Sequence, residues 1–311
     1  MWLSEHRDSK DWRTRMDEAP ITADLSTIAT HLLDTHMPHA AIIDCSASNA
    51  VAEHYPQWLA AGIHVITPNK QAGAGPLERY EAIRAARARS GARFRYEATV
   101  GAGLPVISTL RDLLDTGDEL LAIDGIFSGT LAWLFNKFDG SVAFSELVRQ
   151  AHALGYTEPD PRDDLSGMDV ARKLTILARE AGMPLSLGDV AVESLVPQAL
   201  RDADRDGFMA GLASLDAPML QRLQAARERG CVLRYVARLQ ADGSARVALQ
   251  ELPNDHAFAH LRLTDNCVQY TTRRYCDNPL IVQGPGAGPE VTAAGVFSDL
   301  LRVAGSLGAR L

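Results

Sequence analysis

Residues 40–70 read AAIIDCSASNAVAEHYPQWLAAGIHVITPNK, and this stretch decides the fold. Within it, a segment with helical spacing, Asn49–Ala61, lies between two short apolar runs, Ala40–Asp44 and His64–Thr67. Short apolar runs of this kind are typical of buried strands, so the stretch predicts a strand–helix–strand unit. Such units build parallel sheets, and the sequence therefore predicts an α/β fold.

The alternation of helices and strands continues on both sides of this unit. We expect a helix before it, at Asp24–Thr35, and a helix and a strand after it, at Gly75–Ser90 and Arg93–Val100. Ligand sites in parallel sheets gather at the carboxyl ends of the strands. Here those ends carry small, polar or glycine-rich residues that let a ligand approach the backbone closely: CSAS after the first strand, PNK after the second and GAG after the third.

From about Asp118 the pattern changes to a strand, several helices, a hairpin with its turn at Asp242-Gly243, and two more strands. The helices are expected at Thr130–Phe138, Phe144–Leu154, Met168–Ala181 and Ala217–Arg229, and the strands at Glu119–Ile126, Cys231–Gln240, Ala245–Leu252, Cys267–Thr272 and Leu280–Gln283. This order predicts a second, α+β domain at residues 118–283.

The first domain, residues 1–117, is expected to be completed by residues 284–311. There Gly284, Gly286 and Gly288 open a helix from about Val291 to Leu307. A glycine-rich loop that enters a helix N-terminus is a cradle for an anion or a dinucleotide. The same pattern also occurs as an ordinary turn in many α/β folds, so both interpretations stay open.

Composition limits the partners. The chain has 311 residues, 46% hydrophobic content and a net charge of −8, as expected for a globular protein of two domains. Because it has no basic tract, we expect no nucleic acid and no membrane among its partners, but a small-molecule substrate. The four cysteines form no C-x-x-C pair and are interpreted as reduced. The polar N-terminus resembles no signal peptide and no apolar run reaches spanning length, so a cytoplasmic location is expected.

Residues 155–173, GYTEPDPRDDLSGMDVARK, gather acidic side chains close to a lysine. The prolines at 159 and 161 are expected to hold the first half extended, whereas Asp169 and Lys173 lie four residues apart on one face of a helix. Such a carboxylate-rich bowl suits a substrate ammonium group and presents a lysine to a reacting oxygen. The alternative is that Asp164 or Ser166 caps the helix and that Asp169 and Lys173 form an ordinary surface pair.

Only four of the 31 basic residues are lysines. Lysine can lose its proton when desolvated, whereas arginine stays charged, so a lysine retained in such a chain is a candidate for proton chemistry. Lys70 and Lys173 each end a motif, whereas Lys10 and Lys137 lie in segments that we interpret as solvated surface.

Five motifs, HVITPNK, EATVGAGLP, GIFSGT, GYTEPDPRDDLSGMDVARK and GPGAGPEVTAAGVFSDLL, together resemble homoserine dehydrogenase. The chain is most similar to the dehydrogenase half of the bifunctional aspartate kinase/homoserine dehydrogenases, from about Ala40 to its C-terminus. The resemblance implies an incomplete Rossmann-type parallel sheet domain plus an α+β catalytic and dimerisation domain. The implied reaction is the NAD(P)H-linked interconversion of L-aspartate 4-semialdehyde and L-homoserine, in a homodimer or higher homo-oligomer whose contact the hairpin strands supply.

The resemblance also implies the roles of individual residues. The implied catalytic residues that flank the reacting oxygen are Lys173 and Lys70. The substrate amino group is held by Glu158 and Asp169, supported by Asp164 and Tyr156, and the cofactor, NADP or NAD, lies along Ser46, Lys70, Gly286 and Gly288. A monovalent cation, Na or K, is expected at Glu97 and the carbonyl groups of Val100, Ala102 and Leu104. A tight turn between strand and helix is the alternative for this last segment.

One departure from the family pattern is large. The family opens with a strand, a G-x-G-x-x-G turn and a helix, and the residues before Ala40 contain no such motif. We therefore expect Met1 to fall inside the nucleotide-binding domain, the pyrophosphate cradle to be missing, and the Ala40–Asp44 strand to have an unpaired edge.

Two other functions stay open at this point. The chain is a catalytically silent piece that acts only as a subunit or partner, or it is a different semialdehyde or amino-acid dehydrogenase. The absence of a candidate catalytic cysteine near a glycine-rich turn argues against an acylating enzyme.

Overall fold

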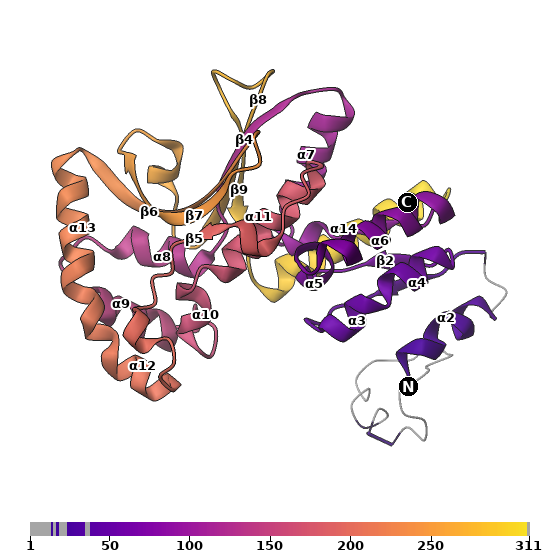
Figure 1. The fold of residues 1–311 in the computed structure, drawn as a ribbon, viewed down its shortest axis with the longest axis horizontal. Helices are drawn as coiled ribbons and strands as arrows, with labels where there is room; N and C mark the ends of the chain where they lie inside the picture. Colours follow the sequence, from indigo (N-terminus) through magenta and orange to yellow (C-terminus); the bar gives the residue numbers. More distant parts are fainter. Residues whose placement is uncertain (1–13, 15–16, 19–23, 35–37, 310–311) are drawn as a thin grey trace.

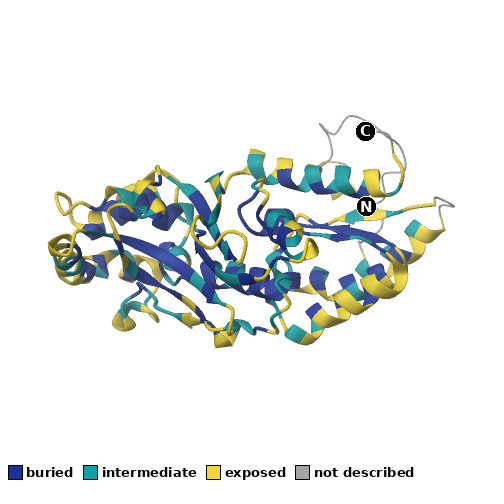
Figure 2. Ribbon diagram, turned by 90° about the horizontal axis from the view of Figure 1, so that it is seen from above, coloured by how far each residue is buried: buried dark blue, intermediate teal, exposed yellow. Residues whose placement is uncertain are grey.

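Two β-sheets, each with its own helices, make up the computed structural model (Figure 1). The structure describes residues 14, 17–18, 24–34 and 38–309. The expected mixed α/β architecture is confirmed, because one sheet is parallel and the other is mainly antiparallel. Figure 2 shows the strands of both sheets as largely buried, while the outer faces of the helices are exposed.

The first sheet is parallel and has the order β1-β2-β3. Its strands are β1 (Ala41–Ile43), β2 (His64–Ile66) and β3 (Phe94–Arg95). The helices around it are α2 (Leu25–Leu33), α3 (Asn49–Glu53), α4 (Tyr55–Ala60), α5 (Lys70–Ala74), α6 (Leu77–Ser90) and α14 (Pro289–Ser306). Within the described residues β1 pairs only with β2, and Ile43 is 45% exposed. The open edge expected for this strand stays a prediction, because most residues before Ala40 lie outside those described.

Two local expectations in this part of the chain were wrong, and one helix was not expected. The helix expected at 49–61 is split, because Pro56 lies in the first turn of α4, where it lacks the N–H that a continuous helix requires. The third strand ends at Arg95, because Glu97–Thr99 forms a 3₁₀ turn (η2). Helix α5 was missed; it begins where the Asn69 side chain accepts a hydrogen bond from the Gln71 N–H.

The second sheet has the order β5-β7-β6-β4-β8-β9. Its strands are β4 (Leu120–Ile126), β5 (Ala191–Val192), β6 (Cys231–Gln240), β7 (Ala245–Pro253), β8 (Asp265–Thr272) and β9 (Leu280–Pro285). The hairpin β6–β7 turns at the expected Asp242-Gly243, where Gly243 has a φ of 85° and the Asp242 carboxylate accepts a hydrogen bond from Ser244 N. The division of the chain at residues 117 and 283 stays a prediction.

The remaining helices lie between the strands of the second sheet or just before it. They are α7 (Val106–Asp115), α8 (Gly129–Lys137), α9 (Phe144–Ala153), α10 (Pro161–Leu165), α11 (Met168–Glu180), α12 (Arg205–Gly211) and α13 (Asp216–Glu228). Helix α10 was not expected. Pro161 occupies its first turn and Asp160 caps it by accepting a hydrogen bond from Arg162 N, so Pro161 starts a helix instead of extending the chain.

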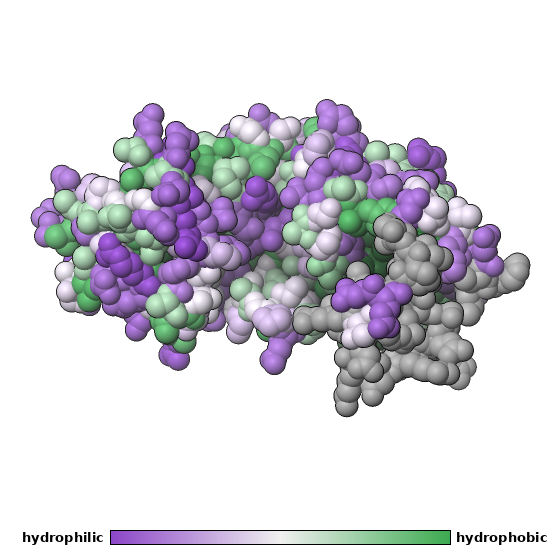
Figure 3. All heavy atoms as spheres, turned by 90° about the horizontal axis from the view of Figure 1, so that it is seen from below, coloured by the Kyte–Doolittle hydropathy of each residue, from purple (hydrophilic) through white to green (hydrophobic). Residues whose placement is uncertain are grey.

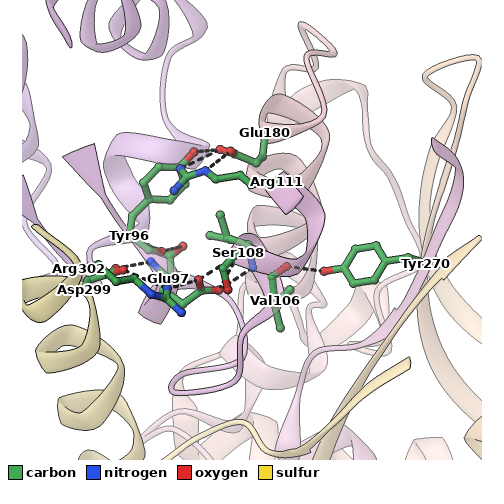
Figure 4. A network of polar contacts seen from close by, with 11 residues as sticks. Tyr96, Glu97, Val106, Ser108, Arg111, Glu180, Tyr270, Asp299 and Arg302 are labelled. Carbon is green, nitrogen blue, oxygen red and sulfur yellow. Dashed lines mark hydrogen bonds and ion pairs between the residues drawn. The ribbon is translucent and has the colours of Figure 1, made fainter. Parts of the chain in front are cut away.

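A buried carboxylate joins the first sheet to α7 and α14. The Glu97 side chain is 4% exposed and accepts hydrogen bonds from Ile107 N (2.6 Å) and Ser108 N (3.0 Å) at the start of α7. Arg302 of α14 donates to the same carboxylate at 3.0 Å, and the backbone N–H of Glu97 donates to Asp299 at 2.8 Å (Figure 4). Because Pro105, the residue before α7, makes no capping bond, Glu97 caps this helix from a distance.

A second set of contacts lies beside Glu97. Tyr96 donates a hydrogen bond to Glu180, at the end of α11, and Arg111 of α7 pairs with the same carboxylate (Figure 4). Consecutive residues of one loop therefore bind α7 and α14 through Glu97, and α11 through Tyr96.

The surface offers no further guide to a partner on the side drawn in Figure 3. Outside the grey atoms, hydrophobic residues lie there in small groups among hydrophilic ones. In the described part of the chain, no helix has the length and apolar character needed to cross a membrane.

We expect Glu97→Gln to lower the free energy of unfolding by about 1–3 kcal/mol, because the half-buried Arg302 and the α7 N-terminus lose the buried carboxylate that is their charged partner. Urea unfolding of the single variants Glu97→Gln and Arg302→Gln and of the double variant measures the coupling between the two residues. Glu290→Gln, an exposed acid on the same helix as Arg302, is the control. Additive effects of the two changes would contradict a stabilising pair.

Candidate active site

A cavity of about 680 Å³ opens between the first sheet and the second. Its walls come from stretches that are distant in the sequence: Pro68 and Lys70; Ala98, Thr99, Gly101 and Ala102; residues 128–130; residues 155–158 with Asp164, Asp169 and Lys173; Thr264; and residues 286–288 with Thr292. The cavity thus contains residues of all five motifs that the sequence singled out.

Asp169 lies between the two candidate lysines. Its Oδ2 is 2.8 Å from Lys173 Nζ, one turn further along α11, and its Oδ1 is 3.3 Å from Lys70 Nζ, at the start of α5. Lys173 is the more enclosed lysine, with its side chain 12% exposed against 34% for Lys70. Lys173 Nζ also donates to Phe127 O at 2.7 Å. The structure therefore brings both lysines to one carboxylate at the cavity wall.

The two ammonium groups govern the charge of this carboxylate. Burial raises the pKa of the Asp169 carboxyl, but the charges of Lys173 and then Lys70 outweigh burial and hold the pKa well below its ordinary value. Asp169 is therefore ionised at every pH at which the protein is expected to work. The arrangement is a fixed carboxylate with two ammonium groups, not an isolated surface pair.

Asp164, at the end of α10, organises the opposite wall. Its Oδ2 accepts a hydrogen bond from Glu158 N at 2.8 Å, and its Oδ1 accepts one from Thr130 Oγ1 at 2.8 Å. Burial is the main cause that raises the pKa of the Asp164 carboxyl, and the nearby charges of Glu158 and Asp169 act in the same direction. The alternative that Asp164 caps α11 is wrong, because Gly167 occupies the cap position and Ser166 Oγ accepts from Met168 N.

The loop that carries Glu158 and Tyr156 forms the outer part of the cavity. Both residues are exposed, and the Tyr156 ring lies 5.7 Å from the Trp133 ring, centroid to centroid. Thr130 Oγ1 lies 2.5 Å from Tyr156 O, so the loop is attached at its backbone while its side chains stay accessible. A ligand can therefore reach the Glu158 carboxylate.

The N-terminus of α8 is a feature of the site to which the sequence assigned no role. Ser128 caps this helix by accepting a hydrogen bond from Leu131 N, and Ser128, Gly129 and Thr130 all line the cavity. Free N–H groups at a helix start attract an anion such as a carboxylate. A serine three residues before an apolar helical run was the available signal within GIFSGT.

Two family models match this chain. Residues 105–301 match the model described as homoserine dehydrogenase, and residues 2–97 match the model described as homoserine dehydrogenase, NAD binding domain. The chain belongs to the homoserine dehydrogenase family. The second match starts well before Ala40, where the resemblance was expected to begin, so that expectation was wrong. The expected loss of the pyrophosphate cradle concerns residues that lie mostly outside those described.

Named relatives agree with the family assignment. The chain is 51% identical over 305 residues to the chloroplastic bifunctional aspartokinase/homoserine dehydrogenase 2 of Zea mays, covering 97% of this chain and 33% of that protein. It is 46% identical over 309 residues to the homoserine dehydrogenase of Emericella nidulans, covering 94% of this chain and 84% of the relative. The chain thus spans about a third of the length of the bifunctional relative.

A solved structure agrees closely with the whole fold. It belongs to a Candida auris protein described as of unknown function, and it superposes with a TM-score of 0.89 at 40% identity. The alignment covers 94% of this chain and 84% of that one.

In this chain the glycine-rich loop before α14 forms the wall of the 680 Å³ cavity on the side where the cofactor is expected. Gly286 and Gly288 line the cavity, and Gly288, with a φ of 114°, leads directly into α14. Ser46 was expected beside the cofactor, but it is not among the residues that line this cavity. Its neighbour Cys45 lines an adjoining apolar cavity of about 430 Å³, which shares Pro68, Gly288 and Thr292 with the first.

The expected cation segment, residues 97–104, is a tight turn with Ala102 in the left-handed region (φ 52°). The Glu97 carboxylate already accepts hydrogen bonds from the start of α7 and from Arg302. Two of the backbone carbonyl groups are also occupied, because Glu97 O accepts from Val100 N and Leu104 O accepts from Val106 N. Nowhere in the described residues do three or more His, Cys, Asp or Glu side chains form a group that could hold a metal ion. A monovalent cation bound by carbonyl groups stays a prediction.

We expect the protonation of Asp164 to determine the acidic limb of the pH profile, which is the fall of kcat/KM as the pH is lowered. Because its pKa is raised and that of Asp169 is lowered, Asp164 takes up a proton first as the pH falls, and its hold on Glu158 weakens. We expect Asp164→Asn to change the acidic limb, whereas Asp163→Asn, a neighbouring change outside the cavity lining, should preserve it. A parental limb in Asp164→Asn would contradict the assignment.

Proposed function

We propose that this chain is an NAD(P)-dependent homoserine dehydrogenase that interconverts L-homoserine and L-aspartate 4-semialdehyde. The observation that carries the proposal is the meeting of Lys70 and Lys173 on Asp169, opposite Glu158 and beside the glycine-rich loop. The family assignment supports the same reaction. The alternative of a catalytically silent subunit finds no support in the described residues, and family membership argues against a different semialdehyde dehydrogenase.

The substrate binds through its two charged ends in this proposal. The Glu158 carboxylate receives the ammonium group through a charge-assisted hydrogen bond, with Asp164 fixing the backbone of the same loop. The N–H groups of Gly129 and Thr130 at the start of α8 receive the carboxylate. With both ends held, the hydroxyl group of homoserine faces Lys70 and Lys173.

The lysines then handle the proton of the reacting oxygen. In the reductive direction the ammonium group of one lysine donates a proton to the oxygen that becomes the hydroxyl group and is left as a neutral amine. In the oxidative direction the same lysine starts as the neutral amine and takes up the hydroxyl proton, while the other lysine stays an ammonium group and stabilises the negative charge on the oxygen. We assign the proton to Lys173, which is the more enclosed of the two. Asp169 already pairs with both ammonium groups, so in this proposal it orients the lysines, and Glu158 is the main partner of the substrate amino group.

A bound NAD(P) supplies the hydride acceptor, and its reduced form supplies the hydride donor. The residues present fit a dinucleotide beside the site, because Gly286 and Gly288 expose their backbone to the cavity and the 18-residue helix α14 follows. We propose Gly286, Gly288 and Lys70 as the contacts on this side. The choice between NAD and NADP, a monovalent cation at residues 97–104, the homodimer and the cytoplasmic location stay predictions.

Lys173→Arg should lower kcat by about 10²–10⁴-fold and leave the melting temperature unchanged, because arginine keeps the charge but does not release a proton readily. The assay follows the absorbance of reduced nicotinamide with homoserine and NADP or NAD. Lys137→Arg, the same change at an exposed position of α8, is the matched control. Parental kcat in the Lys173 variant would refute its role, and a parental chain that fails to oxidise homoserine would refute the function.

Glu158→Gln should raise KM for homoserine more than Glu158→Asp does, because an amide cannot make a charge-assisted bond to the ammonium group. Steady-state kinetics with the three proteins, together with their melting temperatures, measure this order. An unchanged KM combined with a lower melting temperature would instead show that Glu158 only stabilises its loop.

A further inference from the structure

Asn266 of β8 is fully buried beside the active site, and the proposed mechanism does not yet use it. Its side-chain Nδ2 donates a hydrogen bond to Phe127 O at 3.2 Å. Phe127 O is also the acceptor of Lys173 Nζ at 2.7 Å. A neutral amide and the lysine ammonium group therefore meet at one backbone carbonyl, whose two lone pairs are both engaged.

The surroundings of Asn266 fix which way its amide points. A second carbonyl, Gly286 O, lies 3.5 Å from Nδ2, at the long limit of a hydrogen bond. Because both neighbours are acceptors, only the NH₂ side of the amide can face them. The Oδ1 atom on the other side is buried and has no hydrogen-bond partner in the described part of the structure.

The Asn266 side chain also packs so closely against Gly286 that a residue with a Cβ atom does not fit at position 286. A Cβ atom added to Gly286 would lie 2.2 Å from Asn266 Cγ and Nδ2. The backbone holds the two segments together as well, because Asn266 pairs with Gly284 between β8 and β9. The amide thus reaches from the glycine-rich loop to the carbonyl that holds Lys173.

This arrangement controls the direction of the lysine. An ammonium group has three N–H donors. In Lys173 one of them bonds to Phe127 O and another to Asp169 Oδ2, which leaves the third to face the cavity. The position of Phe127 O therefore sets the direction of the third N–H, and the second bond from Asn266 restrains that carbonyl.

We propose that Asn266 is a positioning residue for Lys173, acting through the shared Phe127 carbonyl; the proposal rests on the function proposed above. The charged groups near Lys173 are Asp169 on its own helix, Lys70 on α5, and Asp164 and Glu158 on the opposite wall. None of them substitutes for the amide, because none of them bonds to Phe127 O in the described residues.

Two variants remove the amide donor in different ways. Asn266→Leu has a similar size and lacks the donor, whereas Asn266→Asp places a carboxylate against two carbonyl groups and near Lys173. We expect both to lower kcat by about 10- to 100-fold, while KM for homoserine stays within about threefold. Gln269→Leu, the same amide-to-apolar change on the opposite face of β8, is the control for Asn266→Leu and should keep the parental kcat.

Lysine NMR tests the inference without turnover. The chain has only four lysines, so a sample labelled at lysine Cε gives four signals that Lys→Arg variants assign. We expect the Lys173 signal to move in both Asn266 variants and the Lys137 signal to stay in place.

An unmoved Lys173 signal would overturn the proposal even in an inactive chain, whereas absent turnover in the parent would overturn only the proposed function. Displacement of all four signals with a lowered melting temperature in both variants would show a purely structural role and would also overturn the proposal.

Discussion

The close packing of α5 against α11 is the contact on which the site depends. Gly73 makes it possible, since a Cβ atom there would lie 2.9 Å from Ile176 Cγ1. The buried Arg179 secures the contact by donating to Gly73 O at 2.8 Å and to Leu185 O at 2.9 Å. Helix α5 lies beside the first sheet, whereas α11 is part of the second half of the molecule. Their packing therefore brings Lys70 to the Asp169 carboxylate, with which Lys173 also pairs. A larger side chain at position 73 would separate the two lysines before it affected either directly.

Electrostatics make this meeting of like charges stable. Two ammonium groups repel each other, and enclosure strengthens the repulsion because little solvent remains to screen it. Asp169 offsets the repulsion by pairing with both, and the Phe127 carbonyl gives Lys173 a second acceptor. Asp164 has the opposite environment, with no ammonium group at hydrogen-bond distance among the described residues, so burial raises its pKa. Acids five residues apart in the sequence therefore differ in protonation behaviour because of their neighbours.

Much of the fold was predictable because its signals are local. The apolar runs before CSAS and PNK gave two parallel strands, and the Asp242-Gly243 turn gave the hairpin. The errors came from competing signals of similar strength. Pro56 splits a helix whose apolar spacing is continuous, and Pro161 begins a helix where a Pro-x-Pro pattern suggested an extended chain. The pairing of Lys70 with Asp169 had no local signal, because it depends on the packing of helices about a hundred residues apart. The same holds for Asn266, whose partners come from other elements.

Helix α14 has a consequence for how the molecule is made. It packs against β2 and η2, which lie about two hundred residues earlier in the chain, and its Arg302 and Asp299 complete the contacts of Glu97. During synthesis β1, β2 and β3 emerge before α14, so the face of the first sheet that α14 covers stays open until residues 289–306 have left the ribosome. Non-local contacts of this kind slow folding, since the chain between them must be ordered first. The apolar surface of the first sheet that α14 covers is therefore exposed until α14 has been made, and a chaperone that binds this surface would protect it during that interval.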